Sequence, residues 1–430
     1  MHLKFITSLV FLALCFMACT TNTSKITDPN DYEVYLTTQD TTSLQNTNVR
    51  LAFWNNKLDA DSTRLMAIHP ISEAYSQLFQ ITGNIEYLKN AEKVLQKGVS
   101  IAAIKKEGYL LALARNYISQ HRFLEAESKA IEALSFDKKK KETQLVLFDI
   151  AMELGKYQEA EEYLNQFANQ KDFNFLIRLA KWNDYKGNLS ATIKYMEKAK
   201  AIANQSKDME LMVWTYTNLA DYYGHAGKLE ASYSHYLKTL AIDPSNAYAK
   251  KGIAWIVYSH EFNTKEAHRI IASVMQTHRS PDYHLFKAEL AAYDSKAITK
   301  EKEIQAFLTA VKKESYGDMY NIPIALLMAE EHSKFDEALA IAQKEVANRP
   351  TPQTYDVLAY IYHLKGDHKK ALSIVENHIA DKTFEPIAQF HSAQVYKSNK
   401  MDHKVLPIKE SLLESLYELG PQTGKQLQEL

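Results

Sequence analysis

The sequence predicts an all-α fold in which about ten helical hairpins stack into an α-solenoid. One pattern of small, aromatic and turn residues returns about every 35 residues along most of the chain. No segment combines strand alternation with turn glycines in a convincing way, and the 430 residues contain only 12 glycines. The hydrophobic share of 46% and the charged share of 24% are those of an ordinary folded protein.

Residues 1–18 have the features of a signal peptide. Lys4 supplies a short positive start, and an apolar stretch follows from Phe5 to Ala18. This stretch is too short to span a bilayer as a mature helix and has the length of a signal-peptide core. The simpler of two interpretations is an ordinary secretory signal with a cysteine after it by chance.

The second interpretation depends on the end of this stretch, Phe16-Met17-Ala18-Cys19, where a small residue directly precedes a cysteine. The tetrapeptide resembles the lipobox of bacterial lipoproteins, although Phe16 stands where Leu is usual. The resemblance implies that Cys19 becomes the lipid-modified first residue of the mature chain and anchors it to a membrane. With Thr20 rather than Asp after the cysteine, it implies the outer membrane of a Gram-negative cell. The lack of an acidic cluster there favours the periplasmic face.

Cysteine usage agrees with an anchor. The chain has two cysteines, Cys15 and Cys19, and none after them. The body of the protein therefore has no internal disulfide, no cysteine nucleophile and no cysteine-based metal site. No later segment approaches 18 consecutive apolar residues, so we expect the body to be tethered to a membrane without crossing it.

Residues 19–48 are predicted to be a flexible tether between the anchor and the body. The segment is rich in Thr, Asn, Asp and Ser and has little apolar periodicity. Such a composition buries too little apolar surface to offset the entropy of ordering the chain.

Residues 49–406 carry the repeated pattern. One position in each repeat serves as an anchor for the alignment, and the nine intervals between the first and last anchor cover 317 residues. The anchors are Ser76, Ala114, Phe148, Ala180, Ala220, Ala254, Ala288, Leu326, Ala359 and Ala393. Each repeat is long enough for two antiparallel helices and a short turn.

The repeat around Ala359 shows why these residue types recur. Leu358, Ala359 and Tyr362 share the apolar face of a first helix. An alanine lets two helix axes approach closely, Gly366 ends the first helix, and Ala371 returns the second helix to the contact. One such hairpin cannot bury its apolar face alone, so neighbouring hairpins must stack.

The pattern resembles the tetratricopeptide repeat, a 34-residue helical hairpin. The resemblance covers roughly Leu65 to Ile408 and is strongest around Ala114, Ala220 and Ala359. It implies a right-handed superhelix with a concave groove that is lined by the first helix of each pair and binds ligands.

The resemblance also implies which residues line that groove, because the family uses offsets of −6, −3, +1, +4 and +5 from the anchor. The candidate partner-binding residues are Arg115, Trp214, Thr217, Asp221, Gly224, His225, Trp255, Gln353, Asp356, Tyr360, His363 and Leu364. An aromatic side chain in a groove is a natural anchor for a peptide. The alternative is that Trp214 and Trp255 merely pack against adjacent repeats.

Residues 407–430 are predicted to close the solenoid. The stretch from Pro407 to Leu419 has the composition of a capping helix with a polar outer face, and a tail follows it. Terminal repeats need such a face because nothing stacks on them.

No motif in the sequence predicts catalysis, a cofactor or a metal site. The chain has no GxxxxGK[ST], GxGxxG, GxSxG or HExxH segment. His363 and His368 flank a turn and are expected to point in different directions, which argues against a metal site there. The formal net charge of −1, without a basic excess, argues against a nucleic-acid partner.

The preferred functional hypothesis is therefore a non-enzymatic scaffold, anchored by lipid, that binds segments of partner proteins in the groove. One alternative is an enzyme or a glycan-binding accessory that uses the concave surface as a cleft. It would require a convergent cluster of acidic or histidine residues there. Another alternative is a repeat protein that associates with itself, so the oligomeric state stays open.

Overall fold

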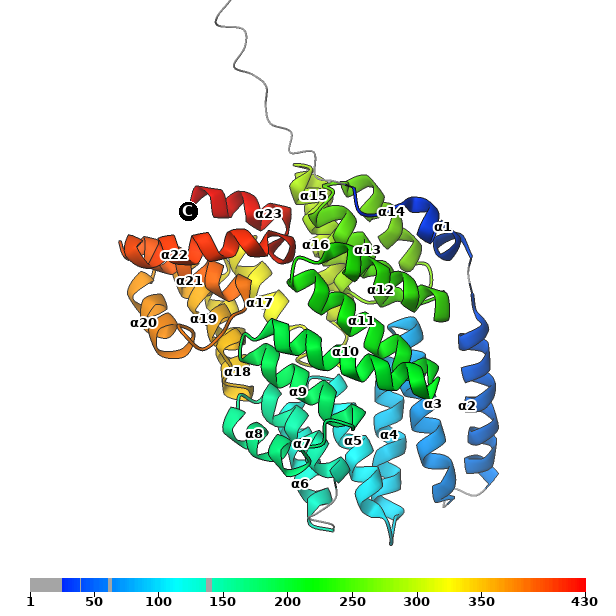
Figure 1. Ribbon diagram of the computed structural model, residues 1–430. Helices are drawn as coiled ribbons and strands as arrows, with labels where there is room; N and C mark the ends of the chain where they lie inside the picture. The colour runs from blue at the N-terminus through cyan, green and yellow to red at the C-terminus, as the bar shows by residue number, and fades with distance from the viewer. Residues whose placement is uncertain (1–24, 39, 61–63, 137–140) are drawn as a thin grey trace, which may run out of the picture.

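The computed structural model describes residues 25–38, 40–60, 64–136 and 141–430 (Figure 1). Within these ranges the chain is helical without a strand, which confirms the all-α class. No helix in them is long and apolar enough to cross a membrane. The predicted signal peptide and the predicted lipidation site, Cys19, lie outside the described residues.

Ten helical hairpins follow one another along the described part of the chain (Figure 1). Their first and second helices are α3 (Ile68–Thr82) and α4 (Glu86–Ile101), α5 (Lys106–Ser119) and α6 (Phe123–Leu134), α7 (Lys141–Glu153) and α8 (Tyr157–Gln166), α9 (Phe173–Tyr185) and α10 (Leu189–Ser206), α11 (Met209–His225) and α12 (Leu229–Ile242), α13 (Ala247–Ser259) and α14 (Thr264–Val274), α15 (Asp282–Tyr293) and α16 (Ala297–Val311), α17 (Asn321–Glu330) and α18 (Phe335–Asn348), α19 (Pro352–Lys365) and α20 (His368–His378), and α21 (Pro386–Ser398) and α22 (Asp402–Leu412). The solenoid of about ten hairpins is therefore confirmed.

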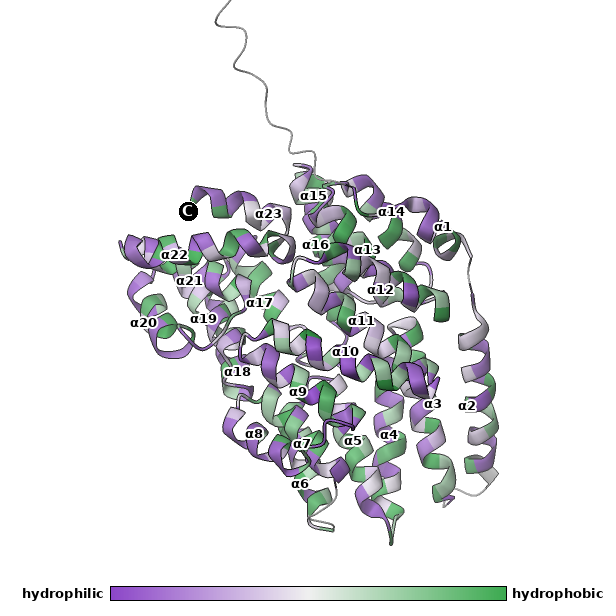
Figure 2. Ribbon diagram, in the orientation of Figure 1, coloured by the Kyte–Doolittle hydropathy of each residue, from purple (hydrophilic) through white to green (hydrophobic). Residues whose placement is uncertain are grey.

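Every sequence anchor lies in the first helix of a hairpin, as the alignment predicts. Eight of the ten are buried, and only Ser76 and Leu326 are half-buried. Around Ala359 the buried core contains Val357, Ile361 and Ala371. Hydrophobic and hydrophilic residues are mixed along the helices (Figure 2), and the apolar residues of one hairpin pack against those of the next.

The superhelix closes tightly enough for successive turns to touch. The Arg279 N–H donates to the Thr82 carbonyl over 2.8 Å. A Cβ at Gly155 would lie 2.8 Å from the Pro350 carbonyl oxygen, and one at Gly187 would lie 2.6 Å from the Phe384 ring. These contacts join residues 82 to 279, 155 to 350 and 187 to 384, separations of 195 to 197 residues. We call this line of contacts the seam.

The N-terminal segment differs from the prediction of a flexible tether over residues 19–48. Residues from 29 to 48 contribute to two helices, α1 (Pro29–Thr37) and α2 (Thr42–Ala60). Helix α2 packs beside α3, while α1 lies on α12 and α14, in the next superhelical turn (Figure 1). The prediction was wrong because Tyr32 and Leu36, too few to show a period, are buried on a distant hairpin.

The C-terminal segment also differs from the predicted division at residue 407. Pro407 lies inside α22, and a short 3-10 turn (Leu413–Ser415) separates it from α23 (Leu416–Glu429). Helix α23 breaks at Gly420, whose φ of 77° and ψ of 163° are not helical, directly before Pro421. The predicted single capping helix from Pro407 to Leu419 is therefore two helices with a turn between them, and α23 does more than cover an end.

Candidate functional site: the inner surface of the superhelix

The first helices line the inside of the superhelix. Successive first helices contact one another directly, as α5 does with α7 and α11 with α13, whereas α1 contacts the second helices α12 and α14. Second helices therefore form the outer layer. We use "inner surface" for the side chains at offsets of −6, −3, +1, +4 and +5 from the anchors.

The structure leaves several of the predicted groove residues accessible. Arg115, Gln353 and His225 are exposed, and Trp214 keeps 41% of its surface exposed. The Trp214 ring meets that of Phe173 edge to face with centroids 6.1 Å apart. Arg115, Gln353 and Trp214 are therefore available to a partner, whereas His225 faces the chain's own C-terminal segment.

Other predicted groove residues are engaged within the protein. Thr217 is buried and donates to the Trp214 carbonyl. Asp356 is buried and accepts from His391 Nδ1 over 2.9 Å, and the Tyr360 ring stacks on His391 with centroids 3.8 Å apart. Asp221 accepts from two tyrosine hydroxyls, those of Tyr236 and Tyr248. These residues hold hairpins together in this conformation.

Trp255 lies under the chain's own C-terminal segment. Its Nε1–H donates to the carbonyl oxygen of Tyr417 over 3.1 Å, and the Ser259 hydroxyl donates to the same oxygen over 3.0 Å. Side chains of α13 therefore bind the main chain of α23. This is the way a groove binds a peptide whose side chains vary.

Neighbouring inner-surface positions complete this contact. Gly224 leaves room for the Tyr417 ring, because a Cβ there would lie 2.7 Å from it. His225 Nδ1 lies 3.7 Å from the Glu418 carboxylate. On α15, the Tyr293 ring lies 3.8 Å from the Lys425 ammonium. Helix α23 thus rests on α11, α13 and α15 together.

Glu289 lies beneath the break in α23. It occupies the +1 position of α15, and a Cβ at Gly420 would lie 3.0 Å from its Oε1 and 3.0 Å from the Trp255 ring. Burial raises the pKa of Glu289 to about 7. The segment therefore covers a carboxyl group that takes up or releases a proton near neutral pH.

The part of the inner surface formed by α5, α7 and α9 is charged. Asp149 pairs with Arg178 over 2.5 Å, and Lys181 pairs with Glu153 over 2.9 Å. Arg115 reaches solvent, but the surrounding wall removes part of its hydration, which lowers the pKa of its guanidinium, and Arg178 adds to the effect. This part offers both signs of charge at close range.

Several of these residues were not among the sequence candidates, although the same offsets find them. The +1 position is Asp149 after Phe148, Lys181 after Ala180 and Glu289 after Ala288. The +4 and +5 positions add, among others, Glu153, Asp184, Tyr258, Ser259 and Tyr293. Applying the offsets to every repeat, and not only to four, was the available signal.

A cluster of ionisable groups lies where α9, α11 and α23 meet. Burial raises the pKa of Asp184 to about 6, and the charge of His225 opposes the rise. Burial likewise raises the pKa of Glu418, again opposed by His225 and reinforced by Glu385. Glu418 belongs to the C-terminal segment itself, so the segment closes this cluster.

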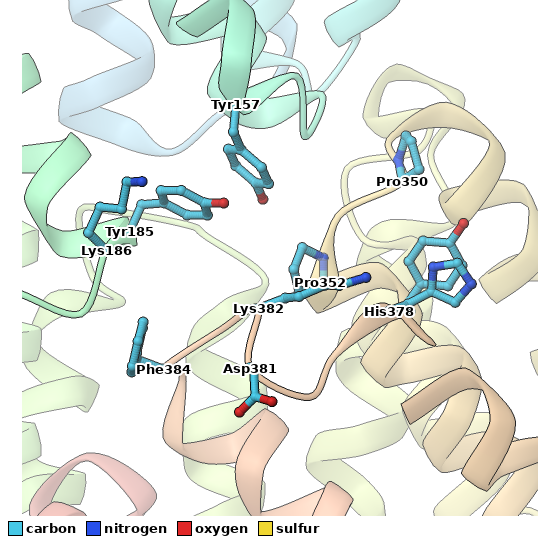
Figure 3. A pocket seen from close by; sticks show the side chains of 10 residues that line it. Tyr157, Tyr185, Lys186, Pro350, Pro352, His378, Asp381, Lys382 and Phe384 are labelled. Carbon is cyan, nitrogen blue, oxygen red and sulfur yellow. The ribbon is translucent and has the colours of Figure 1, made fainter. Parts of the chain in front are cut away.

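A cavity of about 430 Å³ opens at the seam (Figure 3). Its walls carry two stacked pairs, Tyr157 on Tyr185 at 3.9 Å and Tyr355 on His378 at 3.8 Å. In Figure 3 the Tyr157 and Tyr185 side chains lie together on one side of the cavity. Its Lys382 donates to the Asn377 carbonyl. The cavity is aromatic, and this cation is already engaged.

The two turn histidines lie closer than the sequence suggests. The rings of His363 and His368 have centroids 5.3 Å apart, so the expectation that they point in different directions was wrong. Burial lowers the pKa of His363 to about 4. Within the described residues, no three His, Cys, Asp or Glu side chains are grouped to hold a metal ion.

No protein-family model and no curated protein matches the chain. Similar solved structures include the human IFIT1 dimer with PPP-AAAA, at 14% identity over 90% of this chain and 95% of that chain, with a TM-score of 0.45. Pseudomonas aeruginosa pilF is 13% identical over 50% of this chain and 96% of that chain, with a TM-score of 0.36. A tetratricopeptide repeat protein from Parabacteroides merdae is 13% identical over 67% of this chain and 98% of that chain, with a TM-score of 0.34. At TM-scores below 0.5, none of these likenesses bears on what this chain binds.

Proposed function

We propose that this protein is a non-enzymatic scaffold that holds segments of partner proteins on the inner surface of its superhelix. One observation carries the proposal. Inner-surface positions of three consecutive hairpins already bind a peptide segment, the chain's own, partly through donors to a main-chain carbonyl. The same offsets in α5 to α11 present Arg115, Lys181 and the accessible Trp214.

The test is recovery of cross-linked partners from native membranes. The variant Arg115→Ala, Trp214→Ala changes two accessible inner-surface residues and should lose proteins that the wild type recovers. The matched control is Leu124→Ala, Ile131→Ala, two exposed positions on the second helix α6. Recovery of the same proteins by all three chains would contradict the proposal. Recovery of the chain alone would favour self-association.

We propose in addition that Cys19 is lipid-modified and that the body stays on the periplasmic face of the outer membrane. The sequence before Cys19 supports this. The Ile26 and Thr27 N–H groups donate to Glu261, at the turn between α13 and α14. Seven residue steps from Cys19 to Ile26 reach about 25 Å at most. The anchor would therefore keep the turn between α13 and α14 close to the bilayer.

Membrane fractionation tests this attachment. Wild-type chain should sediment with outer membranes and incorporate labelled fatty acid. A Cys19→Ala variant should do neither. Protease added to intact cells should leave a periplasmic body uncut, and rapid cleavage would place the body on the cell surface instead.

A catalytic or glycan-binding function is the second candidate, because Asp184, His225 and Glu418 do converge on the inner surface. The scaffold is preferred because Glu418 is part of the segment that covers the others. Binding of soluble cell-wall glycan fragments to wild type and to Asp184→Asn separates the two. If the protein is a scaffold, the glycan fragments should bind wild type and Asp184→Asn equally. If the cluster is a glycan site, they should bind the variant more weakly.

A further inference from the structure

The C-terminal segment, residues 416–425, lies on the inner surface of α11, α13 and α15, and the proposed function does not explain this contact. Apolar anchoring of α23 lies on its other side. Leu419 and Leu427 pack with Phe390 and Leu412, which belong to α21 and α22. Toward α11 and α13 the contacts include two hydrogen bonds to one carbonyl, a ring beside a glycine and a histidine 3.7 Å from a carboxylate. Leucine side chains therefore anchor one side of the segment, and one tyrosine ring together with hydrogen bonds holds the other.

This division makes the inner-surface contact the more polar of the two. Burial of apolar side chains is the larger stabilising contribution, whereas a hydrogen bond contributes about 0.5–1.5 kcal/mol net. Opening the contact also uncovers Glu289, Glu418 and Asp184, whose raised pKa values show that the covered state holds them in an unfavourable place when ionised. Release of residues 416–425 from α11, α13 and α15 would leave Leu427, beyond the segment, packed with Phe390 and Leu412.

We propose that residues 416–425 are a displaceable occupant of a peptide site, and that a partner segment of the same chemistry takes their place. This rests on the proposed function and names its ligand class. The occupant, Tyr417-Glu418-Leu419-Gly420-Pro421, defines that class: an aromatic residue, an acidic residue and a helix-ending Gly-Pro. The aromatic ring enters beside Gly224, the acid faces His225, and the Gly-Pro break lies against Trp255 and Glu289.

Each element of this class has a physical reason. Only a residue without a Cβ at position 224 leaves space for the ring. A break in the helix exposes the carbonyl of residue 417 to the donors on Trp255 and Ser259. A glycine at position 420 avoids contact with the Trp255 ring and the Glu289 carboxyl, and it adopts a φ of 77° without strain.

The test uses the full chain and a fluorescent synthetic peptide of residues 413–430. Tyr417→Ala weakens the occupant and leaves the site intact. We expect hydrogen-exchange protection of residues 416–425 to fall at least tenfold in this variant, and the peptide to bind it at least tenfold more tightly than it binds wild type. Leu427 keeps the end of α23 attached, and unchanged hydrogen-exchange protection of residues 426–429 verifies this. Tyr417→Leu, which retains apolar bulk, serves if the first variant fails to fold.

A second pair of variants tests the site. Gly224→Ala, added to Tyr417→Ala, should abolish peptide binding because the new Cβ fills the space of the ring. Gly108→Ala is the matched control, since a Cβ there meets nothing closer than the His69 ring at 3.6 Å. A peptide carrying the same Tyr417→Ala change should not bind.

Two results would overturn the inference. One is unchanged protection of residues 416–425 in both position-417 variants, which would make the segment a fixed cap. The other is a released segment with a site that binds no peptide. Neither result touches the recovery of partners through Arg115 and Trp214, so failure of this inference and failure of the scaffold function are distinguishable.

Discussion

The two ends of the described chain hold the same group of hairpins from opposite sides. The N-terminal segment, residues 26–37, lies on the second helices α12 and α14, at the outer layer. The C-terminal segment, residues 416–425, lies on the first helices α11, α13 and α15, at the inner surface. Both contacts join residues more than 150 positions apart in the sequence, as Tyr233 to Asp28 (205) and Ser259 to Tyr417 (158) do.

The two contacts differ in what they bury. At the N-terminal segment, Tyr32 is 1% exposed and its hydroxyl donates to Glu266 over 2.8 Å. Glu261 accepts from three donors of residues 26 and 27, and the Ser273 hydroxyl donates to the Leu36 carbonyl. At the C-terminal segment, Tyr417 is only half-buried and the covered acids have raised pKa values. The difference indicates a permanent strap at one end and a removable occupant at the other.

Tyr32→Ala should have the largest effect, because it removes the main buried side chain of the N-terminal contact. Removing a fully buried aromatic ring costs about 3–5 kcal/mol. Because that exceeds what the remaining contacts of one short helix supply, α1 should detach while the hairpins stay folded. Loss of hydrogen-exchange protection confined to residues 26–37 is the expected readout. Val34→Ala, on the same helix and 56% exposed, is the control, and equal effects of the two changes would contradict a packed strap.

Gly155→Ala should have the next largest effect. It tests whether the seam contributes to holding successive superhelical turns together, apart from the two terminal segments. At Gly155 φ is +70° and the new Cβ would lie 2.8 Å from a backbone oxygen, that of Pro350. Gly227 is the matched control, with φ of +67° and nothing within 4 Å of its Cβ. Gly227→Ala should cost about 1 kcal/mol for backbone strain. Gly155→Ala should cost about 1–3 kcal/mol more for the clash, measured by urea denaturation. Equal costs would mean that the turns separate easily.

The repeat could be predicted from the sequence, but these long-range contacts could not. Anchors such as Ala114, Ala220 and Ala359 recur because each hairpin needs the same close helix crossing, so local pattern and global fold agree. Tyr32 and Tyr417 occur once each, and no period marks them. Contacts between distant residues leave no trace in a single sequence, so residues 29–48 were wrongly predicted to be a tether.

The candidate site was predictable to the same extent. Offsets from the anchors identify Gly224, His225 and Trp255, which do line the inner surface, because they follow from helical geometry. They do not tell whether a position is open. Tyr360 has the same +1 offset as Arg115, yet it is buried against His391. Whether the neighbouring hairpin covers a side chain depends on that hairpin's own residues.

The two segments should respond to pH with opposite signs, by about tenfold in protection. Burial raises the pKa of Glu289 to about 7, so its contribution is complete below its ordinary value of 4.5 and is lost as the pH rises through 7. Arg269 lowers the pKa of Glu266, and the Tyr32 hydroxyl adds to this. The contribution of Glu266 is therefore present above 4.5 and is lost as the pH falls below it.

Protection factors, corrected for intrinsic exchange, check this from pH 3.5 to 8. Residues 416–425 should open between pH 5 and 8, where residues 26–37 stay closed, and residues 26–37 should open below pH 4.5. Glu289→Gln should remove the first response and Glu266→Gln the second. The same sign at both ends would refute the distinction between strap and occupant.

Trp214→Ala should have the smallest effect on stability, about 0.5 kcal/mol or less, because the side chain is 41% exposed and meets Phe173 edge to face. Tyr360→Ala should cost about 3 kcal/mol or more, since it removes a buried ring stacked on His391. Thermal unfolding of the two single variants measures the difference. Trp214 lies on α11, as Gly224 and His225 do. The variant therefore tests whether the accessible part of α11 binds a partner segment, as the part under residues 416–425 binds the chain's own segment. If Trp214→Ala leaves the melting temperature unchanged and reduces partner recovery, the effect is on the surface itself. If it lowers the melting temperature as much as Tyr360→Ala does, Trp214 is a packing residue, and the partner surface must be sought at Arg115 and Lys181.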